Sequence, residues 1–309
     1  MDKIKNSLIL LLTATIWGVA FVAQSAGMEY VGGFTFNCIR SIIGGIVLIP
    51  CVFWLRKRKS KEQGTLLFVE VDVNQCSFWE RNRTLLCGGV CCGVVLCVAS
   101  NLQQQGIKYT SVGKAGFITA LYIVLVPVIS FFMRKKVGKL VWIGMLFAVA
   151  GLYFLCINET LTVGQGDLLV LACAAVFAVH ILVIDYFAPK VDCVAMSCIQ
   201  FITCGILSGI PMLLFETVSM EQLMGAAGPI LYAGVMSCGV AYTLQIIGQK
   251  NMNPTVASMI LSLESVISVL AGLVLLHQKL SGRELLGCVL MFVAVILSQI
   301  PQKKDRNDD

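Results

Sequence analysis

Glu264 is a carboxylate in the middle of an apolar stretch that runs from 255 to 276. If this stretch crosses a bilayer, inserting the charge costs on the order of 2.5–3.5 kcal/mol, so its presence favours a function. On a helical wheel its neighbours Ala257, Ser268 and Ala271 are small, which indicates packed protein or a cavity edge rather than lipid. Two hypotheses remain open: a proton carrier or counter-charge for an amine, and a structural group hydrogen-bonded to neighbouring helices.

Arg40 is the second charge within an apolar stretch, about seven residues into 33–55 and roughly 10 Å deep if that stretch is helical. Asn37 lies one turn earlier on the same face. Arg40 would either contact a substrate carboxylate or bond structurally to helix-end carbonyls or Glu29, or extend its head group to the surface. We favour the structural role.

Neutral polar side chains form two stripes at i, i+3, i+4 spacing. One stripe contains Asn101, Gln104 and Gln105, and the other contains Tyr242, Gln245 and Gln249. We expect the stripes to line one central pathway, with Thr119 and Tyr122 adding to it. The alternative is interhelical hydrogen bonding, worth about 0.6 kcal/mol on average in membranes. His180 lies deep in another apolar stretch, where a lone histidine is more often structural, although it would titrate near neutral pH if functional.

Composition predicts the elements that hold these residues. Of 309 residues, 58% are hydrophobic and 13% charged, and the mean hydropathy is +0.87. Soluble domains are about 45–50% apolar and 25% charged, so this chain is expected in lipid. Continuous apolar runs of roughly 20 residues favour helices over barrel strands. We therefore predict an all-α membrane protein with ten transmembrane helices at about 7–25, 33–55, 84–103, 112–133, 139–157, 166–188, 193–215, 227–249, 255–276 and 282–300.

Motifs for catalysis or cofactors do not emerge from the sequence. The 14 cysteines lie mostly inside apolar runs and none forms a C-x-x-C pair, and the two histidines are His180 and His277. We interpret the cysteines as small packing residues and expect no metal and no cofactor. Phosphate-loop and nucleophile-elbow patterns are also lacking, so we expect neither an enzyme nor ATP-driven transport by this chain alone.

The distribution of lysine and arginine predicts orientation. With the N-terminus in the cytoplasm, 18 of the 23 basic residues fall on the inside, four on the outside, and Arg40 within a span. This bias favours an even number of spans with both termini cytoplasmic. The basic run 56–61 is expected to contact anionic lipid headgroups rather than nucleic acid.

The two halves of the chain match each other at fixed spacings. At 160 residues, Cys38 pairs with Cys198 and Gly45 with Gly205; at 142 residues, the match includes Gln103 with Gln245. A unit of five helices is odd, so its second copy must be inverted in the membrane, a common design of secondary transporters. The first helix resembles a signal peptide in its basic start, but the repeat needs it, which favours its retention.

The spacing changes because the first half has a longer loop at 56–83. Val69, Val71 and Val73 alternate with acidic residues there, a strand-like pattern, and Trp79 is expected at the membrane interface. We expect a cytoplasmic insertion, with a regulatory contact as the alternative.

Several segments carry a family resemblance. Residues 101–127 (NLQQQGIKYTSVGKAGFITALYIVLVP) resemble the third-to-fourth helix region of EamA-type transporters, of the drug/metabolite transporter superfamily. Trp17-Gly18, Arg40, the run Ser262-Leu-Glu264-Ser-Val-Ile and Leu286-Gly287 are similar to that family too. His277-Gln278 stands where the family often has Gly-Glu. The resemblance implies a ten-helix fold and carrier transport of small organic solutes.

The expected organisation is a first five-helix repeat over 1–158 with the insertion 56–83, a second over 159–301 and a cytoplasmic tail over 302–309. We expect a secondary transporter of metabolites, amino acids or drugs in the cell membrane, working by alternating access and as an exporter. Its partners would be solute and lipid but no nucleic acid, as a monomer or homodimer. A membrane-embedded enzyme or a non-transporting assembly subunit is the alternative. The candidate pathway residues are Trp17, Asn37, Arg40, Asn101, Gln104, Thr119, Tyr122, His180, Tyr242, Gln245 and Glu264, and Glu264 is also the candidate for proton coupling.

Overall fold

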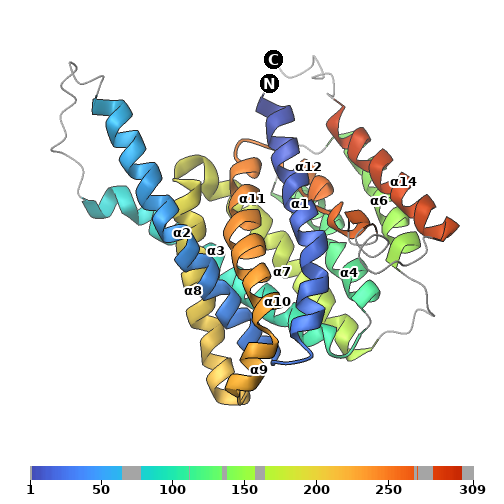
Figure 1. Ribbon diagram of the computed structural model, residues 1–309. Helices are drawn as coiled ribbons and strands as arrows, with labels where there is room; N and C mark the ends of the chain where they lie inside the picture. The colour runs from blue at the N-terminus through green and yellow to red at the C-terminus, as the bar shows by residue number, and fades with distance from the viewer. Residues whose placement is uncertain are drawn as a thin grey trace.

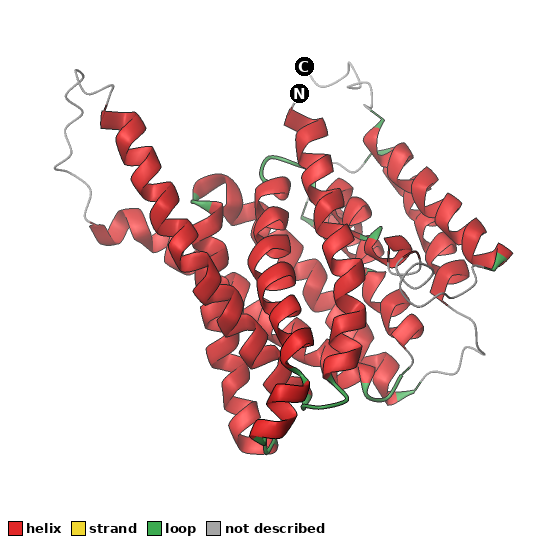
Figure 2. Ribbon diagram, in the orientation of Figure 1, coloured by secondary structure: helices red, strands yellow, loops and turns green. Residues whose placement is uncertain are grey.

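The fold is helical throughout the part of the chain that the structure describes. This computed structural model describes the backbone of residues 2–64, 78–110, 112–133, 138–156, 164–267, 270 and 281–300. Within these ranges no strand occurs (Figure 2). The strand-like segment 69–73 and the pair His277-Gln278 lie outside the described residues.

Figure 1 shows the helices in their order along the chain. The first half contains α1 (Asp2–Gly27), α2 (Gly33–Gly64), α3 (Phe78–Ile107), α4 (Val112–Ala120), α5 (Tyr122–Phe132) and α6 (Lys139–Cys156). The second half contains α7 (Gln165–Phe187), the 3-10 turn η1 (Ala188–Lys190), α8 (Cys193–Phe215), α9 (Met220–Gly225), α10 (Ala227–Tyr232), the π-helix η2 (Ala233–Ala241), α11 (Tyr242–Gln249), α12 (Pro254–Leu261) and α14 (Gly282–Gln299).

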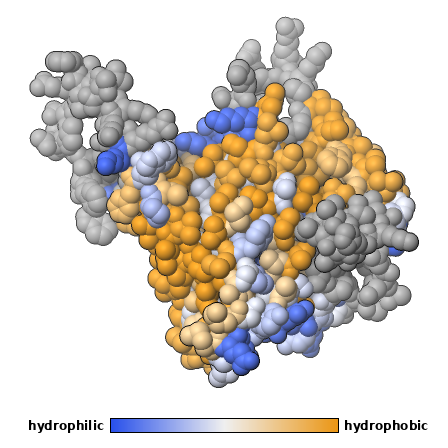
Figure 3. Space-filling model, in the orientation of Figure 1, coloured by the Kyte–Doolittle hydropathy of each residue, from blue (hydrophilic) through white to orange (hydrophobic). Residues whose placement is uncertain are grey.

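Seven helices among the described residues are long and apolar enough to cross a membrane. Two shorter apolar helices, Lys139–Leu155 and Pro254–Ile267, fall where the fifth and ninth spans are expected. A wide face of the molecule is hydrophobic, with hydrophilic residues toward the two ends of the helices (Figure 3). Large apolar side chains such as Phe132 and Leu213 are each 79% exposed, as expected for a surface that contacts lipid. The chain is therefore a multi-pass membrane protein.

Part of the expected loop 56–83 is helical. Helix α2 continues to Gly64 and α3 already begins at Phe78, so only the segment between them lacks a described structure. The extension of α2 is rich in lysine, arginine, glutamate and glutamine, which are strong helix formers. The prediction of a loop was therefore wrong at its two ends. The apolar pattern marks only the part of a helix that is expected in lipid, and α2 and α3 continue beyond that part.

Helices α2 and α8 cross through reciprocal glycine contacts. A methyl group placed on Gly45 would lie 2.8 Å from Ile202 Cγ1, and one placed on Gly205 would lie 2.7 Å from Ile42 Cγ1. Each position is 160 residues from its counterpart, so one contact repeats the other with the halves exchanged. The same exchange holds for α6 and α14: Gly144 packs on the carbonyl of Ala294, and Gly287 on the carbonyl of Gly151.

Two membrane segments are interrupted at corresponding places. Leu121 separates α4 from α5, and Ser262 and Leu263 separate α12 from a helical segment that resumes at 264. The amide of Leu121 bonds to the carbonyl of Ile118 at 3.2 Å, and that of Leu263 to the carbonyl of Ile260 at 3.1 Å. Both are i to i−3 bonds, which tighten the helix locally. The two interruptions are 142 residues apart, the spacing at which the halves match.

The π-helix η2 accommodates one extra residue in the second half. Gly93 packs against the carbonyl of Gln200 and Gly234 against the carbonyl of Arg40, so the two glycines hold equivalent places. Gln103 follows Gly93 by ten residues, whereas Gln245 follows Gly234 by eleven. A π-turn absorbs one added residue without ending a helix, and such turns are frequent at functional sites.

Candidate functional site

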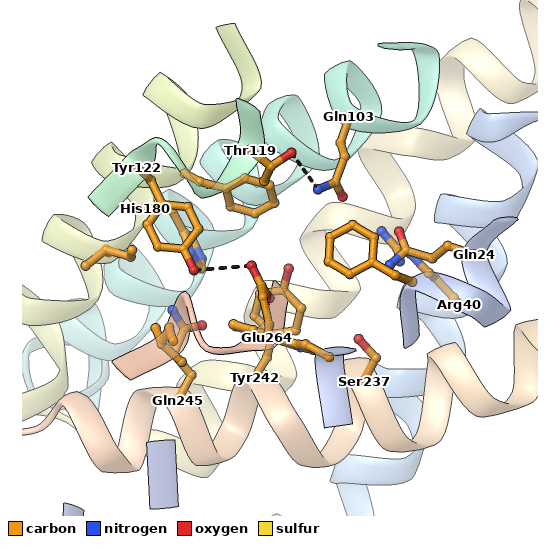
Figure 4. Close-up of a pocket in the computed structure, with 15 residues that line it drawn as sticks. Gln24, Arg40, Gln103, Thr119, Tyr122, His180, Ser237, Tyr242, Gln245 and Glu264 are labelled. Carbon is orange, nitrogen blue, oxygen red and sulfur yellow. Dashed lines mark hydrogen bonds between the residues drawn. The ribbon is translucent and has the colours of Figure 1, made fainter. Parts of the chain in front are cut away.

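A partly open cavity lies between the two halves of the chain. Its walls come from α1, α2, α3, α4, α5, α7, η2, α11, α12 and the segment that starts at 264 (Figure 4). Four of these elements, α1, α2, α3 and α7, are long helices of predominantly apolar segments, yet the lining is largely polar and aromatic. The lining residues are Trp17, Phe21, Gln24, Arg40, Gln103, Thr119, Tyr122, Phe177, His180, Ile181, Ser237, Tyr242, Gln245, Leu261 and Glu264.

Tyr122 and Glu264 join the two interrupted segments at the cavity. The Tyr122 phenol donates to Glu264 Oε1 at 3.2 Å (Figure 4), and the two side chains are 4% and 6% exposed. Each is the first residue after its interruption. Gly18 of α1 lets this region pack closely, since a methyl group there would lie 2.8 Å from the Glu264 carbonyl.

Aromatic rings form a wall of the cavity around Tyr242, the first residue of α11. Its ring centroid lies 4.6 Å from that of Trp17, 5.3 Å from that of Phe201 and 6.1 Å from that of His180. The Trp17 indole Nε1 is buried without a hydrogen-bond partner. Rings in this arrangement offer both apolar contact and a face for cations.

His180 is fully buried on α7, and its Nε2 lies 3.0 Å from Gln200 Oε1 of α8. This neutral pair links two helices of the second half. Its Nδ1 has no hydrogen-bond partner. His180 therefore both forms a structural hydrogen bond and lines the cavity. On the sequence alone, a structural and a functional role were alternatives.

Arg40 is 5% exposed and lines the cavity from α2. Its guanidinium lies over the Phe36 ring, with Cζ 5.4 Å from the centroid, and its Nε has no hydrogen-bond partner. Glu29 is exposed and forms no ion pair with it. The favoured structural interpretation of Arg40 was wrong in its partners, because the side chain neither meets Glu29 nor reaches the surface.

Asn37, Asn101 and Gln104 do not line the cavity. Asn37 Nδ2 donates to Asn101 Oδ1 at 2.9 Å, and Asn101 Nδ2 donates to Ser208 Oγ at 3.0 Å, so this network ties α2, α3 and α8. Gln104 is fully buried with neither amide atom paired. The stripe on α3 was placed on the wrong face: its neighbour Gln103 faces the cavity and donates to Thr119 Oγ1 at 3.4 Å.

Sequence reasoning also missed Gln24, Ser237 and the apolar lining residues Phe21, Phe177, Ile181 and Leu261. Phe21 and Gln24 stand four and seven residues after Trp17, on one helical face, so this spacing was a usable signal. Gln103 had a second signal, its match with Gln245. For Ser237, inside a π-helix, a regular helical wheel gives the wrong direction.

The described lining thus holds one guanidinium, one carboxylate, several amides and hydroxyls, and an aromatic wall. Among the described residues no three histidine, cysteine, aspartate or glutamate side chains gather where they would bind a metal ion. A concave site that combines convergent polar groups with aromatic rings is typical of small-molecule binding.

Comparison with known proteins agrees with this geometry. The EamA-like transporter family matches residues 5–157 and again 164–299. An uncharacterized transporter of Archaeoglobus fulgidus is 28% identical over 96% of this chain and 86% of its own length. The uncharacterized transporter YoaV of Bacillus subtilis is 22% identical over 96% of this chain and 97% of its own. A crystal structure at 19% identity has the same fold, with a TM-score of 0.72 and 96% of each chain covered. The chain belongs to the EamA-like transporter family and is a membrane transporter.

Proposed function

We propose that the protein is a secondary transporter that moves small organic solutes through this cavity by alternating access. The observation that carries the proposal is the pair of helix interruptions, which stand at corresponding positions of the two halves and meet at the cavity through Tyr122 and Glu264. Interrupted helices at equivalent positions of two repeats are a strong pointer to a transporter binding site.

The architecture we propose is ten crossings in two inverted five-helix repeats, 1–158 and 159–301. The reciprocal contacts of Gly45 and Gly205 support a two-fold relation between the halves, because each contact reappears with the halves exchanged. Two states of such a pair are related by the same exchange, which provides an inward-open and an outward-open form. We propose the cell membrane with both termini cytoplasmic. A reporter fused to the C-terminus and active only in the cytoplasm tests this orientation.

Transport is tested with the purified full chain in liposomes, using radiolabelled amino acids, nucleobases and cationic drugs. We expect saturable counterflow of at least one solute and none in protein-free liposomes. Ser237→Trp fills the cavity and should abolish counterflow. Met236→Trp is the matched control, because that neighbour on η2 is 37% exposed and does not line the cavity. Absence of counterflow for the whole panel in the wild-type protein would remove the proposal.

Proton coupling through Glu264 is a separable part of the proposal. Glu264 is the carboxylate of the cavity lining, held by Tyr122. Glu264→Gln should abolish flux driven by a pH gradient in a protein that still folds, with the exposed Glu221→Gln as control. Unchanged flux of the Glu264 variant at every pH would contradict this part alone. Export is the expected direction, which transport in oriented vesicles measures.

A further inference from the structure

The starting observation is a buried cation without a counter-charge. Arg40 is 95% removed from contact with solvent, and its guanidinium has no ion-pair partner within 4.0 Å among the described residues. Its Nε makes no hydrogen bond, and its guanidinium lies over the face of the Phe36 ring. An uncompensated charge inside a membrane protein is costly, and this side chain, which carries five N–H donors, lines the cavity.

The second half of the chain shows how an equivalent position is satisfied. Gln200 stands 160 residues after Arg40. A glycine packs against the backbone carbonyl of each residue: Gly93 against that of Gln200 and Gly234 against that of Arg40. Gln200 is neutral and accepts or shares a hydrogen bond with His180 at 3.0 Å. In the first half the residue that matches His180 is Ala20, which has no polar side chain. The helix packing at this position therefore does not require an arginine.

The groups beside Arg40 point to the kind of anion. Gln24 and Ser237 share its cavity, and their side chains carry an amide NH2 and a hydroxyl that can donate to an anion. Among the described lining residues the one carboxylate is Glu264, which the close-up separates from Arg40 along the cavity (Figure 4). A dianionic phosphate would meet one guanidinium and be repelled by Glu264, whereas a single carboxylate matches a guanidinium in charge and in planar, two-pronged geometry.

The two opposite charges then define a class of solute. The rings of Trp17 and Tyr242, whose centroids are 4.6 Å apart, line the same cavity and favour an apolar body or an ammonium group. We infer that Arg40 is the carboxylate subsite of a cavity that takes a small zwitterion, with the ammonium group of the solute on the Glu264 side. The inference rests on the proposed function and specifies the class of solute that is transported.

The test uses counterflow in liposomes with the twenty standard amino acids as probes. For each one transported, its amide and its N-acetyl derivative are compared, since these lack the carboxylate and the ammonium charge. We expect at least a tenfold loss of flux for both derivatives in the wild-type protein. Arg40→Gln introduces the residue type that the second half has at Gln200. Its flux of the amino acid should fall at least tenfold, and its flux of the amide should equal that of the wild type. Arg40→Lys should retain part of the flux.

Arg83→Gln, on an exposed part of α3, is the matched control and should behave as the wild type. Transport of neutral nucleobases or cationic drugs without any amino acid would overturn the inference and leave the proposed function standing. Amino-acid flux that Arg40→Gln leaves unchanged would remove Arg40 as the subsite. If the folded variant fails with every probe, including the amide, the arginine is structural and the subsite is also refuted. No flux of any solute by the wild type would remove the proposed function itself.

Discussion

The phenol of Tyr122 and the carboxylate of Glu264, 3.2 Å apart, connect the two interrupted membrane segments of this protein. The residues stand 142 positions apart, the spacing at which the halves of the sequence match, and each is the first residue after its interruption. A movement of one segment against the other must therefore stretch or break this bond. Sensitivity to the local geometry is expected here, because hydrogen bonds weaken steeply with distance and misalignment.

Tyr122→Phe removes this donor and keeps the ring. A hydrogen bond contributes about 0.5–1.5 kcal/mol net, so we expect transport to fall by about two- to tenfold. Counterflow in liposomes measures the effect. Tyr153→Phe on α6 is the control, because that ring is 38% exposed and packs edge-on against Phe117. Equal flux in the Tyr122 variant and the wild type would mean that the bond belongs to a resting state only.

The two sides of α3 should respond differently to substitution. Asn101 bonds to Asn37 and Ser208, and its replacement by alanine leaves both without this partner. At about 0.6 kcal/mol for each membrane hydrogen bond, we expect Asn101→Ala to lose about 1 kcal/mol of stability. Thermal unfolding in detergent measures this loss. Gln103→Ala on the cavity side should instead raise the half-saturating solute concentration. The reverse pattern would show that the pathway runs along the other face of α3.

Sequence alone predicts the long helices well, since apolar runs follow lipid contact directly. The run 193–215 coincides with α8, and 227–249 with the span Ala227–Gln249. The interruption at Leu121 is not predictable in the same way, because a single i to i−3 bond leaves the apolar pattern unchanged. At the other interruption, the hydroxyls of Ser258 and Ser262 bond to carbonyls three residues earlier, which disturbs helices, yet serine alone is an ambiguous signal.

The site was harder to predict than the fold. Gln103, Gln104 and Gln105 are consecutive, and successive residues of a helix point about 100° apart, so only the helix rotation decides which one meets the cavity. Helix rotation is set by packing between segments far apart in the sequence. The absence of an ion-pair partner for Arg40 among the described residues likewise depends on tertiary packing. Glu29 and the helix ends are close to Arg40 in sequence and could have been its partners. The repeat was the better guide, because it singles out Gln103 through Gln245.

The crossing of α2 and α8 should not tolerate added volume. Gly205→Leu would drive side-chain atoms into Ile42, where even a methyl group would lie at 2.7 Å. Overpacking of this kind costs about 1–3 kcal/mol, so we expect a lower unfolding temperature and reduced transport. Gly116→Ala is the control, because no atom lies within 4 Å of a methyl group placed there. That control should unfold at the wild-type temperature or above it, since alanine favours helix over glycine by up to about 1 kcal/mol.

Glu216 at the end of α8 caps the first turn of α2. Its Oε2 accepts from the Thr35 amide and hydroxyl, both at 2.7 Å, and its Oε1 accepts from the Phe34 amide at 3.1 Å. In the second half, α8 is capped by its own Asp192, whose Oδ1 accepts from the amides of Val194 and Ala195. The cap on α2 thus joins the two halves of the chain, whereas the cap on α8 is local.

Glu216→Gln replaces one accepting oxygen by an NH2 group, which cannot accept a hydrogen bond from the donors of Phe34 and Thr35. Loss of a helix cap costs about 0.5–2 kcal/mol, so we expect a lower unfolding temperature of the purified protein. Glu221→Gln, exposed on α9, should leave it unchanged. Thr35→Val removes only the hydroxyl donor, and the double variant should lose less stability than the two single variants added together, because both changes break one shared bond. Strict additivity would mean that Glu216 does not hold α2 in the folded protein in solution.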